Sequence, residues 1–285
     1  MNIHSIYAKI AKKKGVFHMF FHKHIEKGKV GEVAYANGSI QFQSVKLNVY
    51  CFELDGIAID AGSQSLAKQF QSFFDERRVD ALYCTHIHED HTGCAAWLQQ
   101  QYSLPIYIHS ISIPEALKSG SYPLYRKLFW GKRQAFRAEP APEAFQSRAY
   151  KWQSIFTPGH SADHLAYLNT STGQLFSGDL FVQVNTKVIL DSESIPQIIE
   201  SIKQVLTYDF EEVFCNHAGY IKDGKQKLQD KLDYLQHVAS EVQLLHEQGL
   251  SVKEIQQRLF PRKYPITTFS FGQWDSKHIV TSILK

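Results

Sequence analysis

The feature that most constrains this chain is the run at residues 86–91, which reads His-Ile-His-Glu-Asp-His and so places three imidazoles and a carboxylate within six positions. The run directly follows residues 79–84, a short apolar stretch typical of a buried strand, and a helix is expected to begin near Thr92. Neutral imidazole and carboxylate are good ligands for zinc and its first-row neighbours. Because a turn that leaves a buried strand can aim several side chains at one point, the run predicts a metal centre at a strand end.

Three further candidate ligands also follow predicted strands. The strands are expected at residues 154–156, 174–177 and 212–215, and the candidates that follow them are His160, Asp179 and His217. In sheets with parallel neighbours, binding crevices form at the carboxyl ends of the strands, so four strand ends can converge on one site. A single His or Asp is usually a surface or core residue. The joint pattern therefore predicts the site, rather than any one of these residues.

The chain around these segments alternates between strand and helix patterns. Further strands are predicted at residues 39–42, 47–53, 57–60 and 166–168, with a hairpin turn at Asp55-Gly56. Apolar residues at helical spacing predict helices at residues 64–76 and 195–206. This alternation is typical of an α/β protein whose sheets carry helices on their outer faces.

Three segments flank or interrupt this pattern. Residues 110–152 are expected to be a helical insertion and a candidate lid, in which Ser112 and Glu115 have the spacing of a helix-capping box. Residues 223–285 predict a helical C-terminal extension packed on a catalytic domain at residues 33–222. Residues 1–32 are expected to be a basic N-terminal segment, because the first thirty residues hold seven lysines and one acid.

The order of the motifs resembles the metallo-β-lactamase superfamily over about residues 33–219: a His-x-His-x-Asp-His run, a Gly-His, a Gly-Asp and a late His. The resemblance implies an αββα sandwich that holds two divalent metal ions. On one metal ion it implies His86, His88 and His160. On the other it implies Asp90, His91 and His217, with Asp179 bridging the two. Zinc is the expected metal, with Mn²⁺ and Fe²⁺ as alternatives.

The resemblance also suggests roles for residues near the ligands. Asp60 and His164 are similar to superfamily positions that hydrogen-bond the ligand loops, and metal-bound imidazoles need such partners to fix their tautomer. A turn Asp and a His at a helix start are the alternative interpretation of these two residues. Tyr220 is a candidate oxyanion or substrate contact, and Tyr125 and Phe129 are candidate substrate contacts in the insertion. Packing is the alternative role for all three.

The chain is most similar to the branch that contains glyoxalase II and β-lactamase-like hydrolases, some members of which cut RNA. This similarity predicts an enzyme in which a metal-bridging hydroxide cleaves an ester, lactone or thioester, since a bound dication lowers the pKa of water to near 7. Asp90 is the catalytic candidate for proton transfer. A metal-dependent RNA phosphodiesterase of the same fold is the first alternative. A di-iron redox protein is the second, although that branch typically has Glu in the place of His88.

Charge favours a small acyl substrate over RNA as the partner. The chain carries 31 Lys and Arg against 28 Asp and Glu, a formal net charge of +3. Binding of an RNA backbone needs a basic track, because phosphate contacts dominate its affinity. Such a track would exist if the N-terminal lysines and the basic residues of the insertion faced the metal cleft, so RNA stays an alternative partner. The basic residues of the insertion are Lys127, Lys132, Arg133 and Arg137.

Cysteine usage and hydropathy bear on the compartment. The four cysteines lie at positions 51, 84, 94 and 215 without CxxC spacing, which indicates reduced thiols rather than a disulfide framework. No stretch approaches the roughly 18 uninterrupted apolar residues of a membrane helix, and no secretion signal is predicted. The expected location is the cytoplasm, with no membrane partner.

Overall fold

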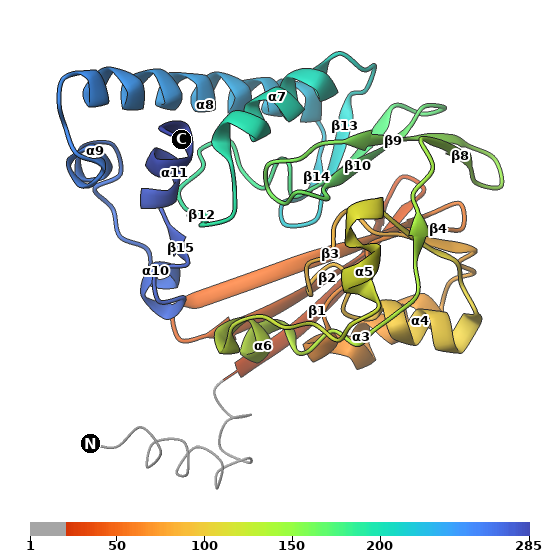
Figure 1. Cartoon of the computed structure of the whole chain (residues 1–285). Helices are drawn as coiled ribbons and strands as arrows, with labels where there is room; N and C mark the ends of the chain where they lie inside the picture. Colours follow the sequence, from red (N-terminus) through yellow and green to blue (C-terminus); the bar gives the residue numbers. More distant parts are fainter. Residues whose placement is uncertain (1–20) are drawn as a thin grey trace, which may run out of the picture.

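The computed structural model describes residues 21–285, so the lysines of the N-terminal segment at positions 9 and 12–14 lie outside the described residues. Two mixed β-sheets form the centre of the molecule, and helices cover the outer face of each sheet (Figure 1). This arrangement is the αββα sandwich, which confirms the fold predicted from the sequence. A two-residue pairing outside the two sheets joins the C-terminal extension to the second half of the sandwich.

The first sheet has seven strands, and their lateral order follows the sequence. They are β1 (Phe21–Val30), β2 (Val33–Phe42), β3 (Val45–Leu54), β4 (Ile57–Ile59), β5 (Ala81–Tyr83), β6 (Ile106–Ile108) and β7 (Glu139–Pro140). Strands β1 to β4 are antiparallel, whereas β4 to β7 are parallel. The full length of β1 pairs with β2, from Phe21 opposite Phe42 to Val30 opposite Val33. Within the described chain the sheet therefore starts with residues 21–30, which belong to the sandwich rather than to a separate basic segment.

The second sheet has six strands in the lateral order β14-β13-β11-β10-β9-β8. Their bounds are β8 (Ala144–Gln146), β9 (Lys151–Phe156), β10 (Leu165–Asn169), β11 (Gln174–Gly178), β13 (Glu212–Cys215) and β14 (Gly219–Ile221). Strand β12 (Ile189–Leu190) pairs with β15 (Trp274–Asp275) outside both sheets. The insertion at residues 110–152 is thus not only helical, because its strands β7 and β8 extend one edge of each sheet. Likewise, the C-terminal extension contains β15 as well as helices.

Helices account for most of the remaining chain. Their bounds are η2 (Gln64–Leu66), α3 (Ala67–Asp75), α4 (Ala95–Tyr102), η3 (Ser110–Ser112), α5 (Ile113–Ala116), α6 (Leu124–Trp130), α7 (Ile195–Leu206), α8 (Gly224–Glu247), α9 (Val252–Leu259), α10 (Pro265–Phe269) and α11 (Lys277–Ile283). Helix α7 and strand β13 have the predicted bounds, and Ser251 and Glu254 form a capping box at α9. The capping box predicted at Ser112 is wrong, because its hydroxyl donates instead to Asp163 Oδ2 at 2.7 Å.

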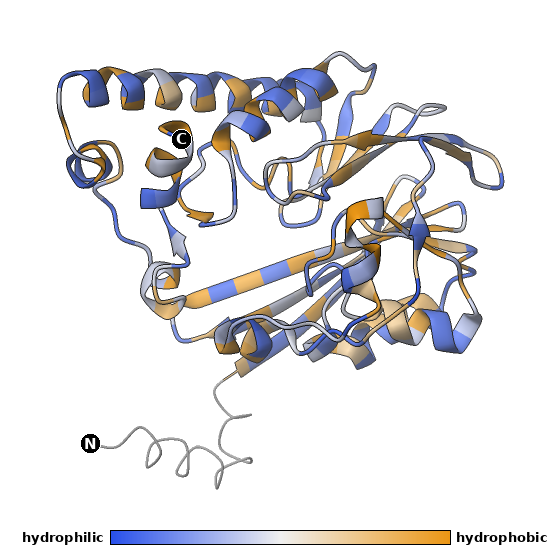
Figure 2. Cartoon of the chain, viewed as in Figure 1, coloured by the Kyte–Doolittle hydropathy of each residue, from blue (hydrophilic) through white to orange (hydrophobic). Residues whose placement is uncertain are grey.

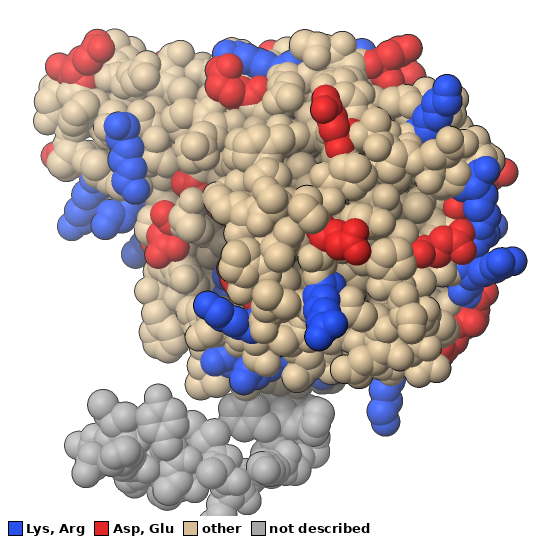
Figure 3. Space-filling model, turned by 45° about the vertical axis from the view of Figure 1, so that its right-hand side comes forward, with Lys and Arg blue, Asp and Glu red and all other residues tan. Residues whose placement is uncertain are grey.

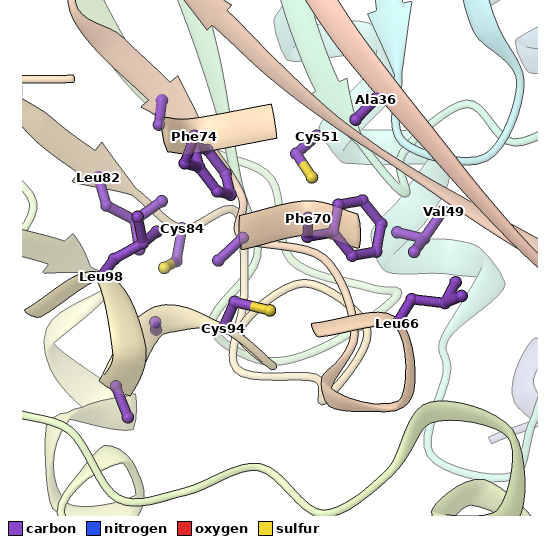
Figure 4. Close-up of a cluster of buried hydrophobic side chains, with 14 of the residues drawn as sticks. Ala36, Val49, Cys51, Leu66, Phe70, Phe74, Leu82, Cys84, Cys94 and Leu98 are labelled. Carbon is purple, nitrogen blue, oxygen red and sulfur yellow. The ribbon is translucent and has the colours of Figure 1, made fainter. Parts of the chain in front are cut away.

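Three hydrophobic layers hold the sandwich together. Buried residues of the first sheet pack on α3 and α4 in one layer, which includes Phe70, Phe74 and Leu98 (Figure 4). A middle layer joins the two sheets, and an outer layer joins the second sheet to α7, α8 and α11. Successive residues of a strand point to opposite faces, so Cys51 packs in the first layer and Phe52 in the middle layer. Figure 2 shows the same alternation of polar and apolar residues along a long strand of the first sheet.

The structure also bears on the predictions about cysteines and membranes. All four cysteines are buried and none forms a disulfide, as predicted. Among residues 21–285, no helix is long and apolar enough to cross a membrane.

Candidate metal centre

The seven predicted ligands come together at one edge of the sandwich, where four strands end. The first four ligands lie on the loop that follows β5, His160 lies in the turn after β9, Asp179 directly follows β11, and His217 lies two residues after β13. Three groups of these residues have ligand atoms that all lie within 4.8 Å of one another. The groups are His86, His88 and His160; His86, His91 and Asp179; and Asp90, His91 and His217.

The first group presents three imidazole nitrogens to a common point. His88 Nδ1 lies 2.9 Å from His86 Nε2 and 3.2 Å from His160 Nε2. Ligand nitrogens around a tetrahedral zinc ion, at Zn–N of about 2.0–2.1 Å, are separated by about 3.3 Å. The spacing of these nitrogens therefore fits a single ion between the three rings.

The third group, Asp90, His91 and His217, lies beside the first, and Asp179 lies near members of both. Asp90 Oδ2 is 3.8 Å from His91 Nε2 and 3.7 Å from His217 Nε2. Asp179 Oδ2 is 3.0 Å from His217 Nε2 and 3.3 Å from His160 Nε2, and these two rings belong to different groups. Asp179 thus lies where one carboxylate can reach ions in both groups.

Two buried polar atoms indicate that these residues are arranged for metal ions rather than for one another. His91 Nε2 and Asp179 Oδ1 are buried without a hydrogen-bond partner among the described residues, and they lie 3.5 Å apart. A buried polar atom without a partner is costly, so a functional explanation is needed. The donor set of five imidazoles and two carboxylates fits zinc and its first-row neighbours. The residues present therefore fit a pair of such ions.

Hydrogen bonds on the second ring nitrogens fix how the imidazoles point. Asp60 Oδ2 accepts from His91 Nδ1 at 2.7 Å and from the Thr85 hydroxyl at 2.7 Å. The same hydroxyl lies 3.0 Å from His86 Nδ1. Because each Nδ1 is held by a hydrogen bond, the Nε2 lone pairs of His86 and His91 face the centre. Asp60 therefore acts on two ligands, and it does so from a left-handed backbone conformation with φ of 59°.

His160 and His217 are oriented by partners that the sequence did not reveal. Glu193 Oε2 lies 3.1 Å from His160 Nδ1, and the backbone carbonyl of Asn48 accepts from His217 Nδ1. Glu193 lies just before α7 and Asn48 lies inside β3, and neither position carries a local sequence signal. Both contacts join segments that are far apart in the chain, so only the fold brings them to the centre.

His164 lies beside the centre and positions Asp179. Its Nε2 accepts from the Asp179 backbone N–H at 2.9 Å, and its Nδ1 lies 2.8 Å from the Thr157 hydroxyl. Burial lowers the pKa of His164 to about 3, so the ring stays neutral and can accept this hydrogen bond. Gly178 permits the close approach, because it has φ of 51° and a Cβ there would lie 2.5 Å from His164 Nε2.

Burial and carboxylates set the protonation of the ligands in the absence of metal. Burial lowers the pKa of His86 and His88 well below its ordinary value. Burial alone would also lower the pKa of His91, but Asp179, Asp60 and Asp90 raise it well above its ordinary value. Burial alone would raise the pKa of Asp179, yet the imidazoles of His217, His91 and His160 hold it well below its usual range. The centre therefore combines ionised carboxylate with imidazoles that carry protons when no cation is bound.

A cavity of about 460 Å³ opens onto the centre. His88, Asp90 and His217 form part of its polar end, and Asp179, His160 and Glu193 also line it. The rest of the lining is mostly apolar and comes from the β2–β3 hairpin, α6, residues 182–190 and the C-terminal extension. This volume is within the range of about 300–1,000 Å³ that is usual for small-molecule sites.

The three residues proposed as substrate contacts have different positions. Tyr125 and Phe129 of α6 line the cavity, although each is largely buried in the fold. Tyr220 lies outside the cavity lining and is 36% exposed, and its hydroxyl donates to Glu212. Its position therefore gives no support to an oxyanion or substrate contact.

The four basic residues that could form an RNA track, Lys127, Lys132, Arg133 and Arg137, do not line the cavity. Arg133 is 1% exposed, and its guanidinium donates to the backbone carbonyls of Lys118 and Glu115. By contrast, Arg126 does line the cavity, where its Nε and Nη2 donate to Glu89 at 2.6 and 2.7 Å. This ion pair fastens α6 to the loop that carries His88 and Asp90.

Comparison with known proteins agrees with this geometry. A family model described as the metallo-beta-lactamase superfamily matches residues 55–217, more than half of the chain. An atrochrysone carboxyl ACP thioesterase from Aspergillus fumigatus is 24% identical over 218 residues, which cover 73% of this chain and 61% of that protein. A hydroxyacylglutathione hydrolase from Thiobacillus denitrificans is 30% identical over 125 residues, which cover 43% of this chain and 41% of that protein. The matches span less than two thirds of the length of these relatives.

Solved structures show the same fold. A beta-lactamase domain protein from Burkholderia ambifaria is similar with a TM-score of 0.66 and 18% identity, over 91% of this chain and 87% of that chain. At this level of identity, the similarity concerns the fold alone. Its coverage of this chain extends well beyond the residues that the family model matches.

Proposed function

Because the chain belongs to the metallo-β-lactamase superfamily, we propose that it is a dinuclear metal-dependent hydrolase, with zinc as its metal, that cleaves a carboxylic ester, lactone or thioester. One observation carries this proposal: two groups of candidate ligands, with Asp179 near members of both, lie at the polar end of a mainly apolar cavity. Relatives named as a thioesterase and as a hydroxyacylglutathione hydrolase support the acyl class of substrate.

A pair of divalent ions would supply water that is deprotonated near neutral pH and a Lewis acid for the carbonyl oxygen. The ligand imidazoles would hold these ions in place, because Asp60, Glu193 and the Asn48 carbonyl fix their orientation. Asp90 is our candidate to accept the proton of the attacking water and to pass it to the leaving group. It lines the cavity and lies between His91 and His217.

The surface and the cavity favour a small acyl substrate over RNA. On the face drawn in Figure 3, basic and acidic side chains are interspersed, without a continuous basic track across that part of the described chain. Of the cations that line the cavity, Arg126 is paired with Glu89 and Lys231 donates to backbone carbonyls, which leaves the exposed Lys46. A polymer backbone would therefore find few cations with which to pair.

The free and buried cysteines support a reducing compartment, and we propose the cytoplasm. This proposal is independent of the substrate, and it can be tested by locating a tagged chain in fractionated cells.

The test of the function is a parallel assay of the metal-loaded protein on esters, lactones, thioesters and single-stranded RNA at about 50 and about 200 mM salt. We expect metal-dependent acyl hydrolysis with little dependence on salt. RNA cleavage that weakens steeply with salt, together with negligible acyl hydrolysis, would reverse the proposal. The variant Asp90→Asn should lose about 10²–10⁴-fold in kcat. Its metal content must be measured alongside, and Asp209→Asn at an exposed position is the matched control.

A further inference from the structure

The segment between α9 and α11, residues 261–276, crosses the open edge of the sandwich, and we call it the C-terminal strap. Figure 1 shows α10 beside the ends of the long strands of the first sheet, while β15 leads back toward α11 and the second sheet. Strand β15 pairs with β12, which places Trp274 opposite Leu190. The strap therefore connects two halves of the molecule that are otherwise joined through the middle layer.

The other end of the strap is fixed by aromatic contacts. The ring centroid of Phe269 lies 5.2 Å from that of Phe129 and 5.6 Å from that of Phe42. The Tyr125 hydroxyl donates to Gln273 Oε1 at 2.5 Å. Helix α6 and the strap are thus packed together, and both line the cavity that opens onto the metal centre. Because the strap is held at both ends, it loses little conformational freedom when a ligand binds, and this favours affinity.

The strap also supplies part of the cavity lining. Tyr264, Pro265, Ile266 and Trp274 line the cavity, and apart from the exposed Pro265 they are only half-buried. Val45 and Leu47 of the β2–β3 hairpin also line the cavity. Apart from Asn48, the residues of the strap and hairpin that line the cavity are neither predicted metal ligands nor hydrogen-bond partners of those ligands. The half-buried apolar side chains of the strap can therefore be covered by an apolar ligand group.

We propose that this region is an acyl-binding site: the carbonyl of the substrate lies at the metal centre and its apolar chain or ring extends to the strap, where Ile266 and Trp274 limit its length. The site rests on the proposed acyl hydrolase function. Moving one methylene from water into an apolar site raises the affinity for the ligand about four-fold. We therefore expect kcat/KM to rise with chain length until the chain reaches the strap, and then to fall.

The experiment measures kcat/KM for a series of p-nitrophenyl esters and thioesters from acetyl to dodecanoyl. Ile266→Trp fills the distal end and should lower the ratio of kcat/KM for long chains to kcat/KM for acetyl by at least about ten-fold. Trp274→Ala should move the optimum to longer chains. Phe271→Ala is the matched control, because Phe271 is on the same strap but is 94% exposed and does not line the cavity. Equal loss at every chain length in both variants would overturn the acyl site.

A second measurement separates this inference from the proposed function. Straight-chain methyl ketones carry a carbonyl and an apolar chain but have no bond that water can cleave, and their binding can be followed by calorimetry. Binding that strengthens with chain length and weakens in Ile266→Trp would support the site even if no acyl substrate is hydrolysed. Hydrolysis of acyl substrates without any dependence on chain length or on the strap variants would leave the function standing and refute the site.

Discussion

Lys231, on helix α8, donates from Nζ to the backbone carbonyl of Phe181 at 2.7 Å, two residues after the ligand Asp179. The same Nζ donates to the carbonyl of Leu180 at 2.8 Å, and the side chain is 4% exposed. The next residue, Val182, has φ of 50°, an unfavourable conformation for a β-branched residue. A lysine of the C-terminal extension therefore holds the segment that follows the shared ligand.

Replacement of Lys231 should change how the free energy of unfolding depends on pH, because this lysine is buried. Burial lowers the pKa of Lys231 to about 8, whereas an unfolded lysine titrates near about 10.4. Between these values the unfolded chain binds more protons, so this group makes the folded protein more stable as pH rises. In Lys231→Met this gain should be absent, and two buried carbonyls lose their donor at a cost of about 1–3 kcal/mol. Urea unfolding of both proteins and of the exposed-site control Lys253→Met measures the difference, and parallel pH profiles would contradict it.

Removal of the carboxylate at position 60 should weaken metal binding without removing a ligand. In Asp60→Asn, the amide can no longer accept from both His91 Nδ1 and Thr85 with the strength of a carboxylate. Loss of such partners typically lowers metal affinity by about 10–100-fold. Competition with a chromophoric chelator gives the affinity, with Asp209→Asn as control. Unchanged affinity would mean that the ring orientation is fixed by packing alone.

The two aspartates of the centre should differ in their effect on metal content. We expect two metal ions per chain in the wild type, fewer at both sites in Asp179→Ala, and loss of a single ion in Asp90→Ala. The reason is that Asp179 Oδ2 lies near rings of both groups, whereas Asp90 Oδ2 contacts only His91 and His217. Elemental analysis of protein purified without chelator provides the measurement. Loss of one ion in both variants would refute the bridging role of Asp179.

Metal binding should release protons and strengthen as pH rises. Although burial opposes it, nearby carboxylates raise the pKa of His91, His160 and His217 above its ordinary value, so these rings carry protons in the metal-free protein. Metal binding requires the neutral imidazole.

The raised pKa also means that these rings stabilise the metal-free fold below about pH 6.5, and that this contribution is lost as pH rises through the folded pKa. Calorimetry in buffers of different ionisation enthalpy, together with unfolding of chelator-treated protein from about pH 6 to about pH 9, tests both statements. Metal binding without net proton release would contradict the first.

Helix α6 should affect both stability and selectivity, through different residues. Phe129 is fully buried against Phe21 and Phe269, so Phe129→Ala should lower the free energy of unfolding by about 3–5 kcal/mol. Tyr125 lines the cavity and bonds to Gln273, so Tyr125→Ala should also change the relative rates across acyl chain lengths. Relative rates and urea unfolding are measured together. Reduced stability with unchanged selectivity in Tyr125→Ala would assign α6 to packing alone.

The sequence by itself predicted which seven side chains the fold brings together and which elements deliver them. A six-residue run and three strand ends were sufficient, because metal chemistry restricts the residue types and strand periodicity is a local property. The bounds of α7 and β13 followed from the same local patterns. The resemblance supplied the αββα arrangement.

Only the tertiary structure decided what surrounds the ligands. Glu193, the Asn48 carbonyl and Lys231 reach the centre from segments that carry no local signal, since a hydrogen-bond partner can come from any part of the chain that the fold brings near. The lysines of residues 21–30 predict a basic arm, whereas in the fold these residues form β1 and pair with β2 along their full length. The position of the strap could not be predicted from the sequence either. Trp274 lines the cavity because β15 pairs with β12, and a pairing between positions so far apart leaves no periodicity in either segment.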